Sequence, residues 1–373
     1  MKKFNLLLMA TLLLATSCYD RREINHLEIV AGIGFDLSND NQIEVSFQIL
    51  NAGALGKNAS GGLEPYWILQ SKGKTTFDAI RKATYTSPNK LFFSHNQVII
   101  ISEDLAKQGI RGIMDLWLRD EEPREDTKMT ICEGKAIDIL KTKLPHGLIP
   151  AYEIVNMIEA SIVAAYAPII TPIDHRRLTA ANIPCTVFGK IVKTSETELE
   201  YKGGALVKDD KLVDYLTETE TRGYLWLKCK IKDGLIIAKT KDSNIVITLE
   251  IIRAKSGFKP VLTKNGQLTF RARADITGRL GEFEDSKSIV DPTAWPGFIE
   301  ALQETVKEEM RAAIAKATYN NLDFLGLNDS VRKYLPKTFK QLASSWEEIM
   351  PLIPFTFEIN IQIIGVGMVK KSF

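Results

Sequence analysis

Residues 27–35 (LEIVAGIGF) and 42–50 (QIEVSFQIL) decide the fold of the N-terminal half of this chain. Apolar and polar residues alternate along the second stretch, whose apolar positions are Ile43, Val45, Phe47 and Ile49. A period of two is typical of a strand with one buried face. Residues 36–41 (DLSNDN) join the two stretches and carry the Asp, Asn and Ser side chains that favour turns. The sequence therefore predicts a β-hairpin.

The pattern that follows the hairpin mixes helix and strand signals. A helix is expected to start near Thr75, with an inward face made of Phe77, Ile80 and Ala83. Residues 97–101 (QVIII) predict a short buried strand. Pro150 suits the first turn of a helix, and the apolar residues after it follow the helical period. The N-terminal half therefore reads as α/β.

From Cys185 onward, short runs of β-type residues alternate with turn signals. Six strands are expected, at residues 186–192, 204–207, 224–231, 235–239, 244–252 and 267–276. A long amphipathic helix should follow Pro296, and a second should span residues 337–349. Residues 355–366 alternate and predict a closing strand. The C-terminal half is therefore expected to hold an antiparallel sheet with long amphipathic helices.

Together these patterns predict a multi-domain α+β chain with mixed α/β content. The polar and charged residues 193–200 are the expected linker. They would separate an N-terminal domain at residues 18–192 from a C-terminal domain at residues 201–373.

The charge balance excludes one class of partner. The chain has 373 residues with 48 Lys and Arg against 46 Asp and Glu, and removal of Lys2 and Lys3 with a signal peptide would leave 46 of each sign. Binding to nucleic acid normally needs a basic stripe or patch, so no nucleic-acid partner is expected. Electrostatic adsorption to anionic lipid is disfavoured for the same reason.

The N-terminus has the pattern of a secretory signal peptide at residues 1–17. Two lysines precede an apolar run at residues 4–15, which is shorter than the roughly 20 residues that span a bilayer. The run ends at Ala-Thr-Ser-Cys18, which resembles the lipobox of bacterial lipoproteins. Ala15 stands where leucine is favoured, and Leu14 lies one place early. Cys18 is therefore the predicted lipidation site, and the alternative is an ordinary signal with an incidental cysteine.

Motifs that would carry enzymatic chemistry are weak. Gly32 and Gly34 lack the third glycine and the helix of a dinucleotide fingerprint, so we expect close strand contacts there. Asp36, Ser38 and Asp40 lack the glycine and the terminal acid of a calcium loop, which favours a plain turn. The carboxylates at residues 115–126 are expected to form a solvated, internally compensated surface.

The histidines and cysteines likewise indicate no catalytic or metal site. His26, His95, His146 and His175 have no metal-site or triad spacing, and His95 is expected to lie in the core or to be hydrogen-bonded. Cys132, Cys185 and Cys229 are odd in number and widely spaced, which argues against a disulfide framework or a zinc site. We therefore expect no cofactor. Trp226 and Trp346 are expected to pack in the core, with an interface anchor as the minority interpretation.

An ordered set of segments resembles one family, the C subunits of the nutrient germinant receptors of endospore-forming bacteria (the Ger(x)C lipoproteins). The matching segments are residues 18–25 (CYDRREIN), 29–36 (IVAGIGFD), 90–95 (KLFFSH), 99–110 (IIISEDLAKQGI), 204–213 (GALVKDDKLV), 220–227 (ETRGYLWL) and 323–327 (DFLGL). Tyr19 stands where the family usually has tryptophan. The resemblance covers nearly the whole chain.

The resemblance implies a lipid-anchored, non-enzymatic subunit on the outer face of the spore inner membrane. Its implied partners are the two integral membrane subunits called A and B, and the membrane itself through a diacylglyceryl group on Cys18. Whether this chain touches the nutrient stays open. One rival is a solute-binding lipoprotein of an uptake system, which would need two parallel-sheet lobes around a cleft. The other rival is an envelope hydrolase, which would need converging carboxylates of raised pKa.

Overall fold

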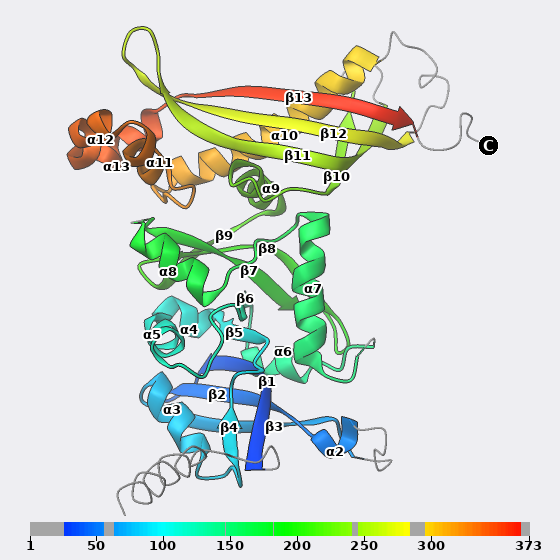
Figure 1. Ribbon diagram of the computed structural model, residues 1–373, viewed down its shortest axis with the longest axis vertical. Coiled ribbons are helices and arrows are strands. Elements are labelled where there is room, and N and C mark those ends of the chain that lie inside the picture. The colour runs from blue at the N-terminus through cyan, green and yellow to red at the C-terminus, as the bar shows by residue number, and fades with distance from the viewer. Residues whose placement is uncertain are drawn as a thin grey trace, which may run out of the picture.

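The computed structural model describes residues 26–55, 63–145, 147–181, 183–240, 245–283 and 295–366. Figure 1 shows an elongated molecule with a large sheet toward one end and a smaller sheet at the other. The larger sheet has nine strands in the order β3-β2-β1-β5-β6-β7-β8-β9, with β4 paired to β1. Successive strands of this sheet follow one another along the long axis of the molecule (Figure 1).

The predicted hairpin is confirmed and lies inside the nine-stranded sheet. β1 (Leu27–Leu37) and β2 (Ile43–Leu50) pair antiparallel, with Phe35 opposite Val45. The other strands are β3 (Tyr66–Gly73), β4 (Lys90–Phe92), β5 (Val98–Ser102), β6 (Lys128–Cys132), β7 (Cys185–Lys193), β8 (Leu199–Lys208) and β9 (Lys211–Leu216). β1, β5, β6 and β7 run parallel to one another, as expected for strands joined by helical crossovers.

Helices cover both faces of this sheet. One face carries α3 (Thr76–Ala83), α4 (Glu103–Gln108), α5 (Arg111–Arg119) and α8 (Pro172–Ala180), and the other carries α6 (Ala136–Lys141) and α7 (Pro150–Ala164). A single turn, α2 (Ala52–Leu55), follows β2. The predicted helix starts at Thr75 and Pro150 are confirmed, since Thr75 caps α3 and Pro150 is the first residue of α7. Phe77 was expected inside, but its side chain is 55% exposed.

β1 separates two hydrophobic cores. Ile33 and Phe35 contribute to the core that contains Trp117, whereas Gly32 and Gly34 face α6 and α7. A Cβ atom at Gly32 would lie 2.7 Å from the Cβ of Ala151. The glycines therefore allow close approach of helices to the sheet, which agrees with the expectation of close strand contacts.

Replacement of Gly32 by alanine should lower the free energy of unfolding by about 1–3 kcal/mol, because the new methyl group overpacks the contact with α7. The matched control is Gly53→Ala in α2, where the nearest heavy atom to the new Cβ is 3.5 Å away. Urea denaturation of the two variants checks this. Equal stability of Gly32→Ala and Gly53→Ala would contradict it.

The smaller sheet has four strands in the order β10-β11-β12-β13. They are β10 (Gly234–Lys239), β11 (Val246–Leu262), β12 (Leu268–Phe283) and β13 (Phe355–Val366). β10, β11 and β12 are antiparallel, as expected, but the closing strand β13 runs parallel to β12. The sheet is therefore mixed, because the helical segment between β12 and β13 returns the chain to the same end of the sheet.

Long and short helices accompany this sheet. α10 (Trp295–Tyr319) packs on it through the predicted apolar stripe, including Phe298, Leu302, Val306 and Met310. α11 (Leu327–Tyr334) follows it. The second predicted helix, residues 337–349, is instead broken into α12 (Pro336–Leu342), a 3-10 turn at Ala343–Ser345, and α13 (Trp346–Ile349).

The predicted meander of six strands is divided between the two sheets. Residues 185–216 complete the larger sheet, and β10 begins the smaller one. The expected strand at 224–231 is wrong, because residues 224–227 are the end of α9 (Glu218–Leu227) and residues 228–231 form a turn and an irregular segment. Thr217 and Glu220 form a capping box there, and this local signal starts a helix despite the β-type residues that follow. The predicted linker, residues 193–200, contains the end of β7, the turn after it and the start of β8, which pairs with β7. The division of the chain into two domains at these residues stays a prediction.

Candidate functional site

The predicted lipidation site lies outside the described residues, as does the predicted signal peptide at residues 1–17. The first described residue is His26, which immediately precedes β1. In Figure 1 the described chain begins toward the end of the molecule opposite the β10–β13 sheet. The two ends of the described chain are therefore associated with different sheets.

α9 joins the part of the chain that forms the larger sheet (residues 27–216) to the part that forms the smaller sheet (residues 234–366), and these parts are the two halves of the structure. It follows β9 directly and packs against α10. A Cβ atom at Gly223 would lie 1.9 Å from the backbone oxygen of Glu309, so only glycine permits this helix crossing. The core around α9 is continuous, because it includes Leu206 of β8 and Leu302 of α10. The two sheets are therefore connected by a packed interior and not only by a strand of chain.

A buried charged cluster fixes this crossing. The Arg222 guanidinium donates to Glu309 Oε1 at 2.7 Å, and Trp226 Nε1 donates to Glu309 Oε2 at 2.6 Å. Arg222 also donates to the backbone oxygen of Leu235 in β10 at 2.9 Å. Both carboxylate oxygens of Glu309 are thus engaged. Trp226, expected in the core, is completely buried.

A second polar contact joins β9 to α10. Lys316 Nζ lies 2.7 Å from Asp214 Oδ2, and the Asn320 amide donates to the same oxygen at 3.1 Å. Partial burial acts to raise the pKa of Asp214, but the Lys316 ammonium and the Tyr215 amide hold it below its ordinary value. Asp214 is therefore charged at neutral pH and bridges the halves.

Replacement of Glu309 by alanine should lower the free energy of unfolding by about 3–5 kcal/mol, because it leaves the Arg222 charge buried without an opposite charge. The control is Asp126→Ala, since the Arg124–Asp126 pair is over half exposed, with side-chain values of 58% and 59%. That variant should change stability by about 1 kcal/mol or less. Guanidinium denaturation checks both values, and a small effect at Glu309 would contradict the importance of the cluster.

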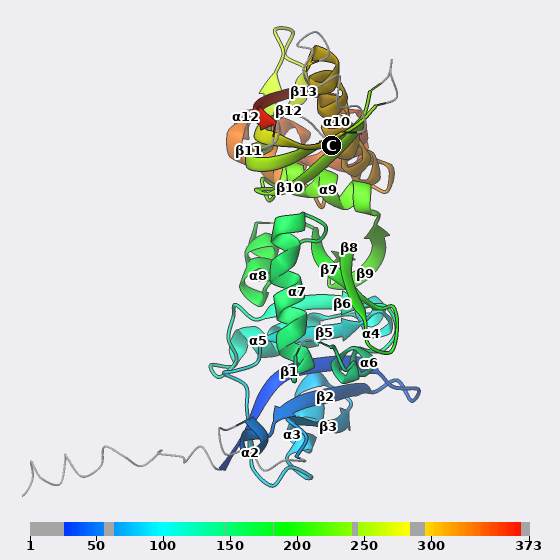
Figure 2. The ribbon, with the colours of Figure 1, turned by 90° about the vertical axis from the view of Figure 1, so that its right-hand side faces the viewer.

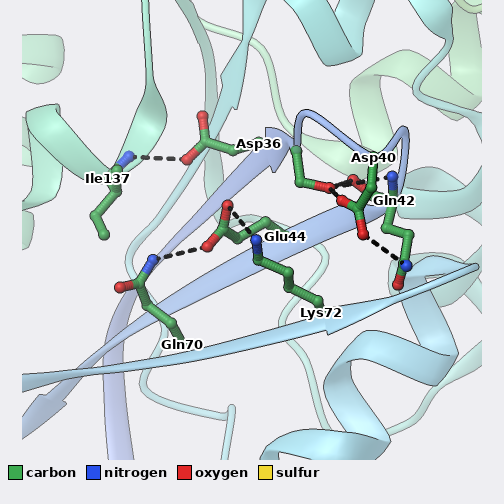
Figure 3. A network of polar contacts seen from close by, with 8 residues as sticks. Asp36, Asp40, Gln42, Glu44, Gln70, Lys72 and Ile137 are labelled. Carbon is green, nitrogen blue, oxygen red and sulfur yellow. Dashed lines mark hydrogen bonds and ion pairs between the residues drawn. The ribbon is translucent and has the colours of Figure 1, made fainter.

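Asp36 and Asp40, which resemble part of a calcium loop in sequence, have structural roles: Asp36 caps a helix and Asp40 stabilises the turn (Figure 3). Asp36 accepts hydrogen bonds from the backbone amides of Ala136 and Ile137 at the start of α6. Burial raises the pKa of Asp36 above its ordinary value, although the hydrogen bonds from these two amides act to lower it. Asp40 accepts from Ser38 and Gln42 within the turn. This is the plain turn that the sequence favoured.

The acidic run at residues 115–126 is largely compensated, as predicted. Arg119 pairs with Asp115 and Arg124 pairs with Asp126. Glu122 accepts from Lys90 and from the Phe93 amide, so it holds β4 in place.

His175 is the histidine with the most distinctive surroundings. Its ring is buried, and Nε2 lies 3.5 Å from Asp210, which also binds Arg111 at 2.8 Å. Burial lowers the pKa of His175 below its ordinary value. Among the described residues, no Ser, Thr or Cys side chain hydrogen-bonds to this ring, so no nucleophile–base pair is formed here. His95, expected in the core or hydrogen-bonded, has an exposed ring that lies 5.8 Å from Phe92.

Two of the described thiols, Cys132 and Cys185, are buried and poorly ionised. Burial raises the pKa of Cys185 to about 12 and raises that of Cys132 well above its ordinary value. Cys229 is exposed. Within the described ranges, no group of three His, Cys, Asp or Glu side chains is arranged to hold a metal ion.

A polar crevice of about 490 Å³ lies between the two halves. It is lined by Pro184 and Lys208 on one side and by Asp323, Trp346 and Glu347 on the other. Asp323 caps α11, because its carboxylate accepts hydrogen bonds from the backbone amides of Leu327 and Asn328. Trp346 is buried, as the sequence indicated. The crevice therefore lies where the two halves meet, with the exposed Glu347 and Glu348 at its edge.

Comparison with known proteins identifies the family. Residues 20–177 match the model of the spore germination protein N-terminal domain, and residues 202–367 match that of the spore germination B3/GerAC-like C-terminal domain. The chain belongs to the GerAC-like family of spore germination proteins. The resemblance noted in the sequence is therefore confirmed over most of its length.

Relatives of similar length come from Bacillus subtilis strain 168. Spore germination protein KC is 25% identical, with 97% of this chain and 95% of that protein covered. Spore germination protein B3 is 24% identical, with 96% of each covered, and spore germination protein A3 is 23% identical, with 90% of each covered.

A solved structure supports the fold of this GerAC-like chain. The crystal structure of the GerBC protein aligns with a TM-score of 0.58 at 19% identity, covering 89% of this chain and 97% of that one. The multi-domain α+β fold expected from the sequence is thereby confirmed. Among the described helices, none is both long and apolar enough to cross a bilayer.

Proposed function

We propose that this protein is a lipid-anchored, non-catalytic subunit of a nutrient germinant receptor that helps to assemble or couple the receptor during spore germination. The observation that carries the proposal is the match of two spore germination domains, which together extend from residue 20 to residue 367 with one short gap. The relatives named KC, B3 and A3 are spore germination proteins that match across at least 90% of their own length.

The anchor in this proposal is a diacylglyceryl group on Cys18, after removal of residues 1–17. Two acyl chains make membrane attachment durable, whereas one chain alone binds marginally. Cys18 precedes the start of β1 at Leu27 by nine residues, which can extend over roughly 30 Å at most. The N-terminal end of the larger sheet would then stand close to the membrane.

Anchoring also supplies the mechanism of assembly. A domain held at one membrane surface meets membrane partners at a high effective concentration, so modest interfaces suffice. The proposed partners are the integral A and B subunits, and the proposed location is the outer face of the spore inner membrane. In this scheme residues 18–192 form the membrane-proximal domain, and residues 201–373 form the domain that docks onto partners.

A non-catalytic role is supported by the state of the reactive groups. The buried thiols are protonated at neutral pH, and the Glu309 and Asp323 carboxylates are committed to structural contacts. A solute-binding lipoprotein is the alternative function. It predicts binding of a nutrient by the isolated chain, which calorimetry with amino acids, sugars and nucleosides would detect.

Replacement of Cys18 by alanine should release the protein from the membrane fraction and slow nutrient germination, because the acyl anchor is lost. The measurement is fractionation of spore membranes together with germination rates. The matched control is Cys229→Ala, which removes an exposed thiol of the C-terminal half. Normal membrane retention and normal germination of Cys18→Ala would refute the anchor.

A further inference from the structure

The outer face of the β10–β13 sheet carries exposed charged side chains, and α11 touches this face where Tyr334 lies beside Lys259. Residues alternate along each strand, and the inward set packs on α9 and α10. Figure 2 shows α10 lying along one side of this sheet. On β12 the outward set includes Arg271, Arg273 and Arg279, which are exposed, while Ala272 and Ala274 between them are buried.

This outward surface is basic. We define its part on the three neighbouring strands β11, β12 and β13 as the basic face. Its cations are Arg253, Lys255, Lys259, Arg271, Arg273 and Arg279, and its anions are Glu250, Asp275 and Glu358. Six cations against three anions give a net charge of +3, on a chain whose total formal charge is +2. The positive charge is therefore concentrated here.

One arginine forms ion pairs with two of the three anions on the basic face. Arg273 pairs with Asp275 at 2.9 Å and with Glu358 at 3.1 Å. Asp275 also accepts from Asn360 at 2.8 Å. In the register Lys255 lies opposite Asp275 and Arg279 lies opposite Glu250, whereas Lys259 and Arg271 lie opposite each other.

Two cations of the basic face make no direct polar contact, although the charge of Lys255 helps to lower the pKa of Asp275 opposite it. Within the described part of the chain, the side chains of Lys255 and Arg271 make no ion pair and no hydrogen bond. Lys259 contacts only the ring of Tyr334, with Nζ 5.7 Å from its centroid. Lys259 lies directly opposite Arg271 in the antiparallel register. Like charges placed opposite each other destabilise a sheet, so this pair favours an added negative charge.

The basic face is also hollowed where these cations meet. A depression of about 620 Å³ is lined by four cations, Lys255, Lys259, Arg271 and Arg273, and by two carboxylates, Asp275 and Glu358, among others. The residue opposite Arg273 in the register is Gly257, which has no side chain to fill the space between the two lysines. A partner's carboxylate side chain can therefore enter between several cations.

We propose that the basic face binds an acidic segment of a protein partner, with Asp or Glu side chains seated in the hollow around Arg271. This inference rests on the proposed function, in which the partner is a membrane subunit of the receptor. Arginine and lysine bind carboxylates through charge-assisted hydrogen bonds, and arginine can do so with two parallel bonds. Complementary charge of this kind speeds encounter and suppresses wrong partners.

Anionic lipid is the less favoured occupant for two reasons. The basic face belongs to the sheet opposite the end where the described chain begins, so an anchor at Cys18 would hold it away from the membrane surface (Figure 1). Asp275 and Glu358 also stand within the face, and they would repel a continuous anionic surface but leave room for single carboxylates between the cations.

The test uses the full chain with Lys255→Glu, Lys259→Glu and Arg271→Glu, here called the reversed-face variant. Its control carries Lys211→Glu, Lys230→Glu and Lys232→Glu, three exposed positions off the basic face with the same change in net charge. Binding of a fluorescent glutamate-rich peptide is measured for the wild type and both variants at low and high salt. Circular dichroism checks that all three proteins are folded.

We expect the reversed-face variant to bind the peptide at least tenfold more weakly than the wild type, and the control to bind as the wild type does. High salt should weaken wild-type binding, since exposed charges are screened. Equal peptide binding by the wild type and the reversed-face variant would overturn the proposal. Tight wild-type binding to phosphatidylglycerol vesicles that the reversal abolishes, without peptide binding, would overturn it in favour of lipid.

A second measurement separates this proposal from the proposed function. The wild type and both variants are co-expressed with the receptor A and B subunits and purified from detergent-solubilised membranes. Loss of the subunits from the reversed-face variant alone supports both proposals. Failure of the wild type to retain the subunits, with peptide binding intact, refutes the receptor role and leaves the basic face as a site for another acidic protein.

Discussion

The crossing of α9 and α10 is the constraint on which the two-sheet arrangement depends. It needs a glycine at position 223, because any side chain there would overlap the backbone of Glu309. It also needs the Glu309 carboxylate, which binds Arg222 and Trp226 of α9 from the facing helix. With the crossing fixed, α9 follows β9 of one sheet and packs against β11 of the other. The apolar surfaces of both sheets then merge into one interior.

Local patterns predicted most of the N-terminal half because its signals are short-range. The hairpin of β1 and β2, the cap at Thr75 and the helix start at Pro150 each follow from residues within a few positions of one another. Gly32 was also informative, since a glycine in a buried strand often marks close approach of another backbone. Phe77 was misplaced, because its helical period gave a face but not the direction of the core.

The C-terminal half was harder to predict because its pairing is non-local. β13 was located correctly, but nothing in residues 355–366 shows that it runs parallel to β12. Residues 224–227 contain Tyr224 and Trp226, which favour strands, and the capping box that starts seven positions before Tyr224 outweighed them. The basic face was missed for the same reason. Its cations alternate with apolar residues on separate strands, and only the register brings Lys259 and Arg271 together.

The order in which the strands pair has a consequence for biosynthesis. The larger sheet is complete once Leu216 has been made, because all of its strands precede that residue. The smaller sheet must wait for β13, whose first residue, Phe355, pairs with Phe270, 85 positions earlier in the chain. Contacts between such distant residues form slowly, since a long loop must close before they are made. If translation stops before residue 355, the larger sheet can fold but β12 lacks its partner β13. The unpaired backbone groups of β12 would then be exposed at a sheet edge, where they can pair with other chains. We expect cellular proteases to remove such a truncated form.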